Sequence, residues 1–166
     1  MVVQIDSREH RSELNRVCAQ FDRLGVKYFI SKLQVGDYMS LDNARLVVDR
    51  KQNLTELCSN VCQDHDRFRR ELQRAAENGI KVIFVCEHGE GIETLEDVIF
   101  WNNPRRTKRI KENGQWKTVE TKATTGDTLY KILQTIERKY DTEFIFCGKG
   151  ETGNVIKTIL ENGGTD

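Results

Sequence analysis

The sequence lacks any apolar run long enough to cross a lipid bilayer. Its longest uninterrupted apolar stretch covers residues 82–86, whereas a transmembrane helix needs about 20 apolar residues. The N-terminus, MVVQIDSREH, also lacks the basic segment followed by an apolar segment that marks a secretory signal. We therefore expect an intracellular, cytoplasmic protein.

The chain also lacks net charge and an obvious disulfide framework. Its 26 lysine and arginine residues balance 26 aspartate and glutamate residues, so overall charge indicates neither a nucleic-acid partner nor an acidic substrate. The five cysteines are odd in number and scattered along the chain, which favours a reduced protein. With 166 residues and no internal repeat, we expect a single domain over residues 1–166.

The hydrophobic pattern predicts an α/β protein. Residues 2–5 form a short apolar strand candidate, residues 26–51 resemble three strands of an antiparallel meander, and the nearly continuous apolar run at residues 80–88 predicts a buried central strand. Helical spacing of apolar residues predicts helices around residues 14–24, 54–61, 68–76, 129–140 and 155–160. Helices that alternate with strands in this way predict a three-layer domain, with helices on both faces of a sheet.

The stretch LVVDRK, residues 46–51, ends a predicted strand in an acid and two bases. Side chains alternate along a strand, so Asp49 and Lys51 share one face and Arg50 points to the other. Asp37 lies one predicted hairpin away and brings a second carboxylate from the adjacent strand. Two such carboxylates can hold Mg²⁺, and a lysine beside them can stabilise charge on a phosphate. The alternative is a solvated ion pair at a strand end, which contributes only about 0–1 kcal/mol.

Two other charged clusters are interpreted as structural. Glu137-Arg138-Lys139 has the same order of charges as Asp49-Arg50-Lys51. It lies in the last turns of a predicted helix, however, where consecutive side chains point in different directions around the axis and cannot converge on one site. A run of acids, Glu87, Glu90, Glu93, Glu96 and Asp97, surrounds two glycines. We expect this run to form a solvated loop and a helix start, and not a second metal site.

Three motifs together resemble a known nuclease family. Asp6-Ser7-Arg8-Glu9, Gly36-Asp37-Tyr38 and Val48-Asp49-Arg50-Lys51 precede a leucine-rich helix. They are similar in order and separation to the D-x-R-E, V-G-D-Y and E-R-K motifs of the XPF-type structure-specific nuclease domain, a branch of the PD-(D/E)xK superfamily. The resemblance is specific over residues 2–88 and implies a restriction-endonuclease-like core with a mixed central sheet. It is nearest to the compact single-domain versions of bacteria and phages, which implies a bacterial or phage-infected host cell.

The resemblance implies a Mg²⁺- or Mn²⁺-dependent endonuclease that hydrolyses phosphodiester bonds in branched, flapped or junction DNA during repair or recombination. The implied catalytic residues are Asp6, Asp37, Asp49, Arg50 and Lys51. The implied metal-binding residues are Asp6, Glu9, Asp37 and Asp49. Two alternatives stay open, namely a non-catalytic DNA-binding or scaffold module of the same fold, and a resolvase or restriction-type nuclease.

This sequence departs from the family pattern in three ways. Asp49 replaces the usual glutamate, and Thr55 stands where the family carries an aspartate. The resemblance implies a homodimer, but the helix-hairpin-helix module through which many members dimerise is not found in this sequence. The shorter Asp49 side chain keeps the carboxylate but changes its reach.

With no net charge, DNA affinity must come from local basic patches. Residues 102–126 are expected to form a surface insertion or weak hairpin, in which Arg105, Arg106, Lys108, Arg109, Lys111, Lys117 and Lys122 face only Glu112 and Glu120. Such a segment can contact phosphates, and Trp116 within it can stack an unpaired base, although a solvated loop is the alternative. The expected DNA-binding residues are Arg8, Arg67, Arg70, Arg105, Arg106, Lys108, Arg109 and Trp116.

Overall fold

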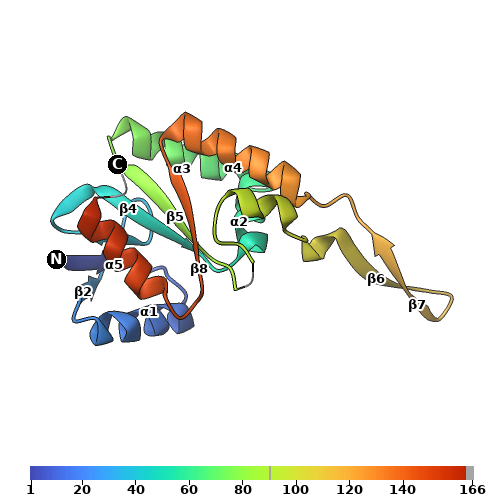
Figure 1. Ribbon diagram of the computed structural model, residues 1–166, viewed down its shortest axis with the longest axis horizontal. Coiled ribbons are helices and arrows are strands. Elements are labelled where there is room, and N and C mark those ends of the chain that lie inside the picture. The colour runs from blue at the N-terminus through green and yellow to red at the C-terminus, as the bar shows by residue number, and fades with distance from the viewer. Residues whose placement is uncertain (90, 164–166) are drawn as a thin grey trace.

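A six-stranded mixed sheet lies at the centre of the computed structural model, which describes residues 1–89 and 91–163 (Figure 1). The strands are β1 (Val2–Ile5), β2 (Lys27–Ile30), β3 (Tyr38–Ser40), β4 (Asn43–Lys51), β5 (Lys81–Glu87) and β8 (Glu143–Cys147). Their order in the sheet is β2-β1-β3-β4-β5-β8. β3 is antiparallel to both of its neighbours, while the other strand pairs are parallel. The carboxyl ends of β1, β4 and β5 therefore lie at the same edge of the sheet.

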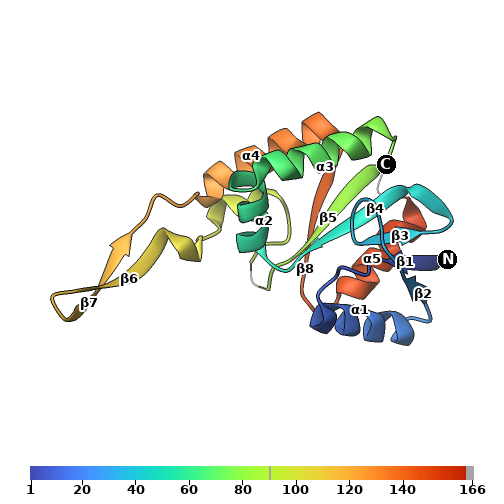
Figure 2. The ribbon, with the colours of Figure 1, turned by 180° about the vertical axis from the view of Figure 1, so that it is seen from behind.

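Helices cover both faces of the sheet (Figures 1 and 2). One face carries α1 (Arg11–Arg23) and α5 (Thr152–Asn162), and the other carries α2 (Leu54–Cys62), α3 (His65–Glu77) and α4 (Gly126–Tyr140). Each face has its own buried apolar cluster, so the expected three-layer α/β architecture is confirmed. In the described segments, every helix is too short or too polar to cross a membrane.

The expected alternation of β4 is also confirmed. Val47 packs in the cluster beneath α2, α3 and α4, whereas Leu46 and Val48 pack in the cluster beneath α1 and α5. Because alternate residues of a strand share a face, Asp49 and Lys51 follow Val47 toward α2 and α3. Arg50 follows Val48 toward α1.

The expected meander is wrong in its first strand. β2 pairs in parallel with β1, with Val2 opposite Lys27, and lies at the edge of the sheet away from β4. The reason is α1, which intervenes between the two strands and returns the chain so that β2 runs in the direction of β1. β3 and β4 do form the predicted antiparallel hairpin, with Tyr38 opposite Val48.

A second, two-stranded sheet projects from the body of the protein (Figures 1 and 2). It consists of β6 (Thr107–Glu112) and β7 (Gln115–Glu120), and we call residues 107–120 the arm. Asn113 and Gly114 connect the strands, with φ values of 51° and 80°. Two successive positive φ angles are typical of the tight hairpin turns whose twist matches the flanking strands.

The base of the arm is anchored by a buried amide. Two short 3₁₀ helices, η1 (Glu96–Phe100) and η2 (Pro104–Arg106), lead into the arm. Between them, the buried side chain of Asn103 donates to Thr124 O at 2.8 Å and accepts from Arg105 N at 3.0 Å. Thr121 N also donates to Arg106 O at 2.7 Å. These bonds hold together the two chain segments that enter and leave the arm.

Gly126, the first residue of α4, packs so closely against η1 that alanine is expected to destabilise the protein. A Cβ atom at this position would lie 2.4 Å from Val98 O and 2.7 Å from Ile99 O. These are backbone atoms that cannot rotate away, so we expect Gly126→Ala to lower the free energy of unfolding by about 1–3 kcal/mol. Gly150→Ala is the matched control, because nothing lies within 4 Å of its Cβ position. Urea unfolding midpoints that are equal for the two variants would contradict this packing.

Candidate active site

A cavity of about 320 Å³ opens at the carboxyl ends of β1 and β4 and extends to α2 and α3. It is lined by Asp6, Arg8, Glu9, Gly36, Asp37, Asp49, Arg50, Lys51, Glu56, Asn60, Arg67 and Glu71. All three sequence motifs contribute to it, so the fold brings together residues that are more than 40 positions apart in the chain. The lining is dominated by charged side chains of both signs.

Asp37 is positioned by the glycine before it. Gly36 has φ +67°, and a Cβ atom there would lie 3.1 Å from Val47 and from Val48 O, so the turn favours glycine. The Asp37 N–H donates to Val48 O at 2.8 Å, and its Oδ2 accepts from Arg50 N at 2.7 Å. Burial, reinforced by the nearby negative charges of Asp49 and Glu9, raises the pKa of Asp37 well above its usual value. Asp37 is thus a buried carboxyl group beside a second carboxylate, that of Asp49.

Lys51 reaches back toward the carboxylate of Asp49 on the same strand face. Its Nζ lies 2.6 Å from Asp49 Oδ1 and 5.7 Å from the centre of the Phe84 ring. Burial acts to lower the pKa of Lys51, but Asp49 and Asp37 outweigh it and raise that pKa above its usual value. The ammonium group therefore stays charged at neutral pH.

The donor set of this cavity fits a hard divalent cation. Asp49 Oδ1 is buried, and its one close partner among the described residues is Lys51 Nζ, at 2.6 Å. A carboxylate oxygen has two lone pairs, so this atom retains capacity for a ligand. Within residues 1–89 and 91–163, no group of three His, Cys, Asp or Glu side chains gathers tightly enough to hold an ion without other ligands. Mg²⁺ is commonly held by one or two carboxylates, with water and substrate phosphate completing its shell. Asp37 and Asp49 are the pair that could hold it here.

Asp6 and Glu9, predicted as metal-binding residues, both contact arginines. Asp6 Oδ2 accepts from Arg8 Nε at 2.7 Å, and its Oδ1 accepts from Leu33 N at 3.2 Å. Glu9 Oε2 accepts from the Arg50 guanidinium at 3.1 and 3.2 Å. Burial raises the pKa of Glu9, against the opposing effect of Arg50. Asp6 thereby fixes Arg8 at the rim, and the metal-binding roles of Asp6 and Glu9 stay predictions.

Arg50 lines the cavity, but its guanidinium turns toward a buried ion-pair network beneath α1. Only 6 % of its side chain is exposed, and its terminal nitrogens lie 3.1 Å from Glu9 and 3.2 Å from Glu87. These acids raise the pKa of Arg50 despite its burial. This network gives Arg50 a structural function. Its catalytic role remains a prediction.

The expectation that Glu87 lies in a solvated loop is wrong. Glu87 is the last residue of β5, its side chain is fully buried, and it accepts from Thr152 Oγ1 at 2.6 Å as well as from Arg16 and Arg50. Because β5 is covered on both faces, its charged end is buried with it. Asp97 of the same acidic run accepts from Thr94 N, whereas Glu90 lies outside the described residues.

The eight residues predicted to bind DNA fall into two groups. Arg8 and Arg67 line the cavity, and Arg70 is exposed on α3 beyond the lining. The remaining five lie in the arm or at its base and are exposed, namely Arg105, Arg106, Lys108, Arg109 and Trp116. The two groups are linked through α2, because Arg105 donates to Ser59 Oγ at 2.6 Å.

Three cavity residues were missed by the motif comparison, Glu56, Asn60 and Glu71. Glu56 takes part in a capping box, in which Asn53 Oδ1 accepts from Glu56 N and Glu56 Oε2 accepts from Gln52 N, both at 2.8 Å. Asn60 follows one helical turn later on the same face. Helical spacing from Glu56 is the signal that could have found it.

The triplet Glu137-Arg138-Lys139 lies on a helix as predicted, but Glu137 is half-buried and does not belong to a solvated face. It lies near the end of α4, where its Oε1 accepts from Phe144 N at 3.1 Å. This bond joins α4 to β8, on the far side of the sheet from β1. The triplet is not part of the cavity lining.

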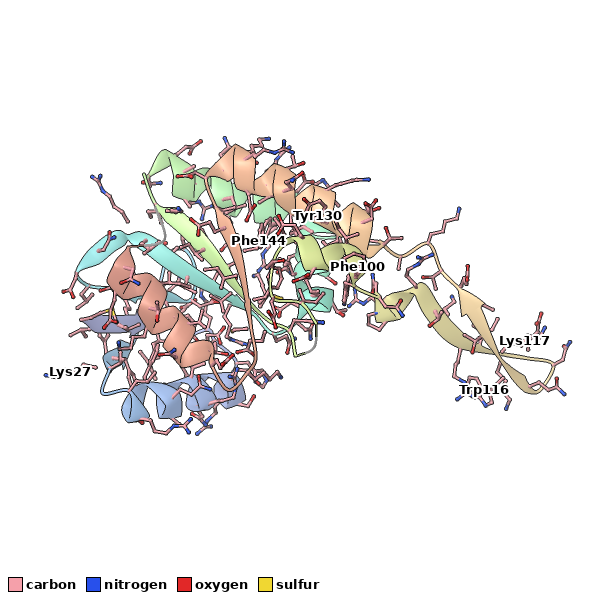
Figure 3. All side chains as sticks on the ribbon, viewed as in Figure 1. Lys27, Phe100, Trp116, Lys117, Tyr130 and Phe144 are labelled. Carbon is pink, nitrogen blue, oxygen red and sulfur yellow. The ribbon has the colours of Figure 1, made fainter. Side chains whose placement is uncertain are left out.

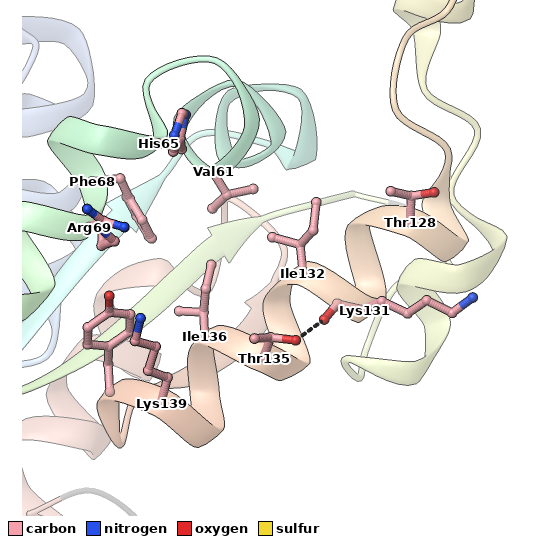
Figure 4. Close-up of a pocket in the computed structure, with 11 residues that line it drawn as sticks. Val61, His65, Phe68, Arg69, Thr128, Lys131, Ile132, Thr135, Ile136 and Lys139 are labelled. Carbon is pink, nitrogen blue, oxygen red and sulfur yellow. Dashed lines mark hydrogen bonds between the residues drawn. The ribbon is translucent and has the colours of Figure 1, made fainter.

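A larger cavity, of about 430 Å³, lies between α3 and α4 (Figure 4). Its walls include Val61, Phe68, Ile132 and Ile136, with Arg69 and Lys139 at its margin. It contains no carboxylate among its lining residues. Size alone would favour this larger cavity as the active site. The smaller cavity is the better candidate, because it contains paired acids and a charged lysine.

The fold and the smaller cavity define the class of protein. The mixed sheet flanked by helices, with all three motifs at one cavity, agrees with the XPF-type nuclease domain that the motifs resemble, and the family match confirms that resemblance. The chain belongs to the ERCC4 domain family, whose model matches residues 5–159.

Solved structures share the fold of this chain. XPF from Aeropyrum pernix is 21 % identical to this chain with a TM-score of 0.64, and the match covers 98 % of this chain and 65 % of that one. XPF from Aeropyrum pernix in complex with DNA gives the same identity and TM-score, with 98 % and 64 % covered. This chain therefore spans just under two-thirds of the length of either. No curated protein matches it significantly.

Proposed function

We propose that this protein is a metal-dependent, structure-selective endonuclease that hydrolyses phosphodiester bonds in branched, flapped or junction DNA. The observation that carries the proposal is the convergence of Asp49 and Lys51, at the end of β4, with Asp37, which directly precedes β3, inside one cavity. The ERCC4 domain family and the DNA bound to the XPF from Aeropyrum pernix support DNA as the substrate.

The side chains of the cavity have distinct parts in this reaction. Asp37 and Asp49 would hold Mg²⁺ or Mn²⁺, which supplies Lewis acidity to the reacting phosphate and to the attacking water. Lys51, kept charged by Asp49, stabilises the negative charge that develops on the phosphate. Arg8 and Arg67 at the rim bind the flanking phosphates. Because the pKa of Asp37 is raised, lowering the pH protonates it and should slow cleavage.

Binding of the cation should be visible without any DNA. Saturating Mg²⁺ or Mn²⁺ is expected to raise the melting temperature by about 5–10 °C, since a ligand at 100 times its Kd stabilises by about 2.7 kcal/mol. The shift should be larger at pH 8 than at pH 6, because protons compete with the cation for Asp37. Asp37→Asn should abolish the shift. Asp42→Asn, at an exposed turn, is the matched control, and an equal shift in both variants would place the cation elsewhere.

Cleavage of labelled fork, flap, Holliday-junction and linear DNAs in Mg²⁺ or Mn²⁺ tests the proposal directly. We expect the wild type to cut the branched substrates in preference to the linear duplex, and Lys51→Ala to cut each of them more slowly. DNA binding without cutting of any substrate would support the non-catalytic scaffold. Equal cutting of linear and branched DNA would support a restriction-type nuclease.

A further inference from the structure

The arm has two chemically different faces. Directly opposed residues of an antiparallel pair share a face, and Lys111 lies opposite Trp116 while Arg109 lies opposite Thr118. We call the side of the arm that carries these four residues the Trp116 face. The opposite face carries Lys108, Ile110, Lys117 and Val119. Trp116 and Lys117 accordingly project to opposite sides of the arm (Figure 3).

The Trp116 face is cationic and exposes its indole. The Arg109 guanidinium lies 5.4 Å from the centre of the Trp116 ring, and 61 % of Trp116 remains exposed. The acid nearest the tip, Glu112, lies on the opposite face and is paired there with Lys117. Within the arm, the one acid on the Trp116 face is Glu120, at the base. Lys111 therefore has no acidic neighbour on its own face of the arm, and Arg109 has only Glu120, diagonally across the strand pair.

The arm is connected to the active site through a single short helix. Arg105, at the base of the arm, donates to Ser59 of α2, while Glu56 and Asn60 of the same helix line the acidic cavity. α2 has nine residues, so it spans only about 13 Å. The cavity and the base of the arm are thus separated by no more than the length of α2, so one DNA molecule is long enough to contact both.

We infer that the Trp116 face is a second nucleic-acid site, where an unpaired base stacks on Trp116 and Arg109 and Lys111 contact the flanking phosphates. An exposed aromatic ring beside cations is a typical platform for single strands, since every base offers a π face. Bases within a duplex are already stacked and cannot occupy it. The choice of DNA as ligand rests on the proposed function, but binding at this face does not require the acids of the cavity.

Tryptophan fluorescence with single-stranded oligothymidylate in EDTA tests this site. Stacking should quench the emission of Trp116, while Trp101, the other tryptophan, is buried and should respond little. Trp116→Ala is expected to abolish the quenching and weaken binding about 5- to 150-fold. Arg109→Ala should weaken binding and reduce the slope of log K against log salt by about 0.7.

Lys117→Ala is the matched control. It removes one positive charge next to Trp116 but on the opposite face, so binding and quenching should stay within about 2-fold of the wild type. Equal losses in Lys117→Ala and Arg109→Ala would overturn the inference, because net charge alone would then explain binding. Equal quenching by polyglutamate would also overturn it and indicate an acidic protein partner.

The two proposals can fail separately. Normal oligothymidylate binding by Trp116→Ala, in a protein whose wild type cuts DNA, would overturn the second site and leave the nuclease intact. Quenching that is lost in Trp116→Ala, in a protein that cuts nothing, would support the second site and overturn the proposed nuclease. Asp37→Asn should retain the quenching, because Asp37 lies in the cavity and not in the arm.

Discussion

Asp37→Asn is expected to reduce DNA cleavage by about 10³-fold or more, equivalent to about 4 kcal/mol of transition-state stabilisation. Asparagine keeps an oxygen that can accept from Arg50 N, so the backbone around the site is preserved. It removes the charge that would bind the cation with Asp49. Initial rates of cleavage of a labelled flap substrate measure the loss, and Asp42→Asn should cut at the wild-type rate. Cleavage by Asp37→Asn within 10-fold of the wild type would remove Asp37 from the site.

The same substitution should leave the protein equally stable or more stable. The folded protein raises the pKa of Asp37, so the stability contributed by this group is present below its unfolded pKa and is lost as the pH rises through its folded pKa. At pH 8 without divalent cations, the charged form therefore destabilises the fold, and asparagine relieves that effect. Urea unfolding at pH 8 should show a midpoint at or above that of the wild type.

Arg50→Ala is expected to be the most destabilising substitution, lowering the free energy of unfolding by about 3–5 kcal/mol. The buried guanidinium neutralises Glu9 and Glu87, and the Glu87 side chain is completely buried. Arg16 still contacts Glu87 in the variant. Glu9, however, loses both of the hydrogen bonds that it accepts from the Arg50 guanidinium. Thermal unfolding should show a decrease in melting temperature on the order of 10 °C.

Arg45→Ala is the control for Arg50→Ala. Arg45 lies on the same strand and is exposed, so its loss should change the free energy of unfolding by less than about 0.5 kcal/mol. The double variant Arg50→Met/Glu9→Gln should recover part of the stability, because Glu9 is the largely buried acid that loss of Arg50 leaves without its arginine, whereas Glu87 keeps Arg16. Equal melting temperatures for Arg50→Ala and Arg45→Ala would show that the buried network does not stabilise the fold.

The convergence of Asp37, Asp49 and Lys51 could be predicted because it depends on local rules. Strand alternation places Asp49 and Lys51 on one face, and a hairpin between consecutive strands brings Asp37 beside them. The parallel pairing of β2 could not be read from its own residues, because the crossover through α1 sets its direction. An alternating apolar pattern predicts a strand, but it does not predict which strand will pair with it.

Burial of charge was the main point that the sequence could not predict. In the sequence, Glu87 resembles the acids that follow it, which are expected to be solvated. Its burial is favourable only because Arg16 of α1 and Arg50 of β4 pair with it. Similarly, the sequence shows that the arm is basic, but the strand register decides that Glu112 pairs with Lys117 and leaves Arg109 with Trp116. Both are consequences of contacts between distant or opposed residues.

The position of β4 between β3 and β5 has a consequence for how the protein opens. β4 packs against both apolar clusters, so a fluctuation that separates β4 from the sheet must disrupt both layers at once and approaches global unfolding in cost. The arm forms a separate sheet, and its strands can part while both apolar clusters remain intact. The proposed catalytic residues thus lie in the most cooperative unit of the protein, whereas the arm, which we infer to bind DNA, can rearrange at little energetic cost.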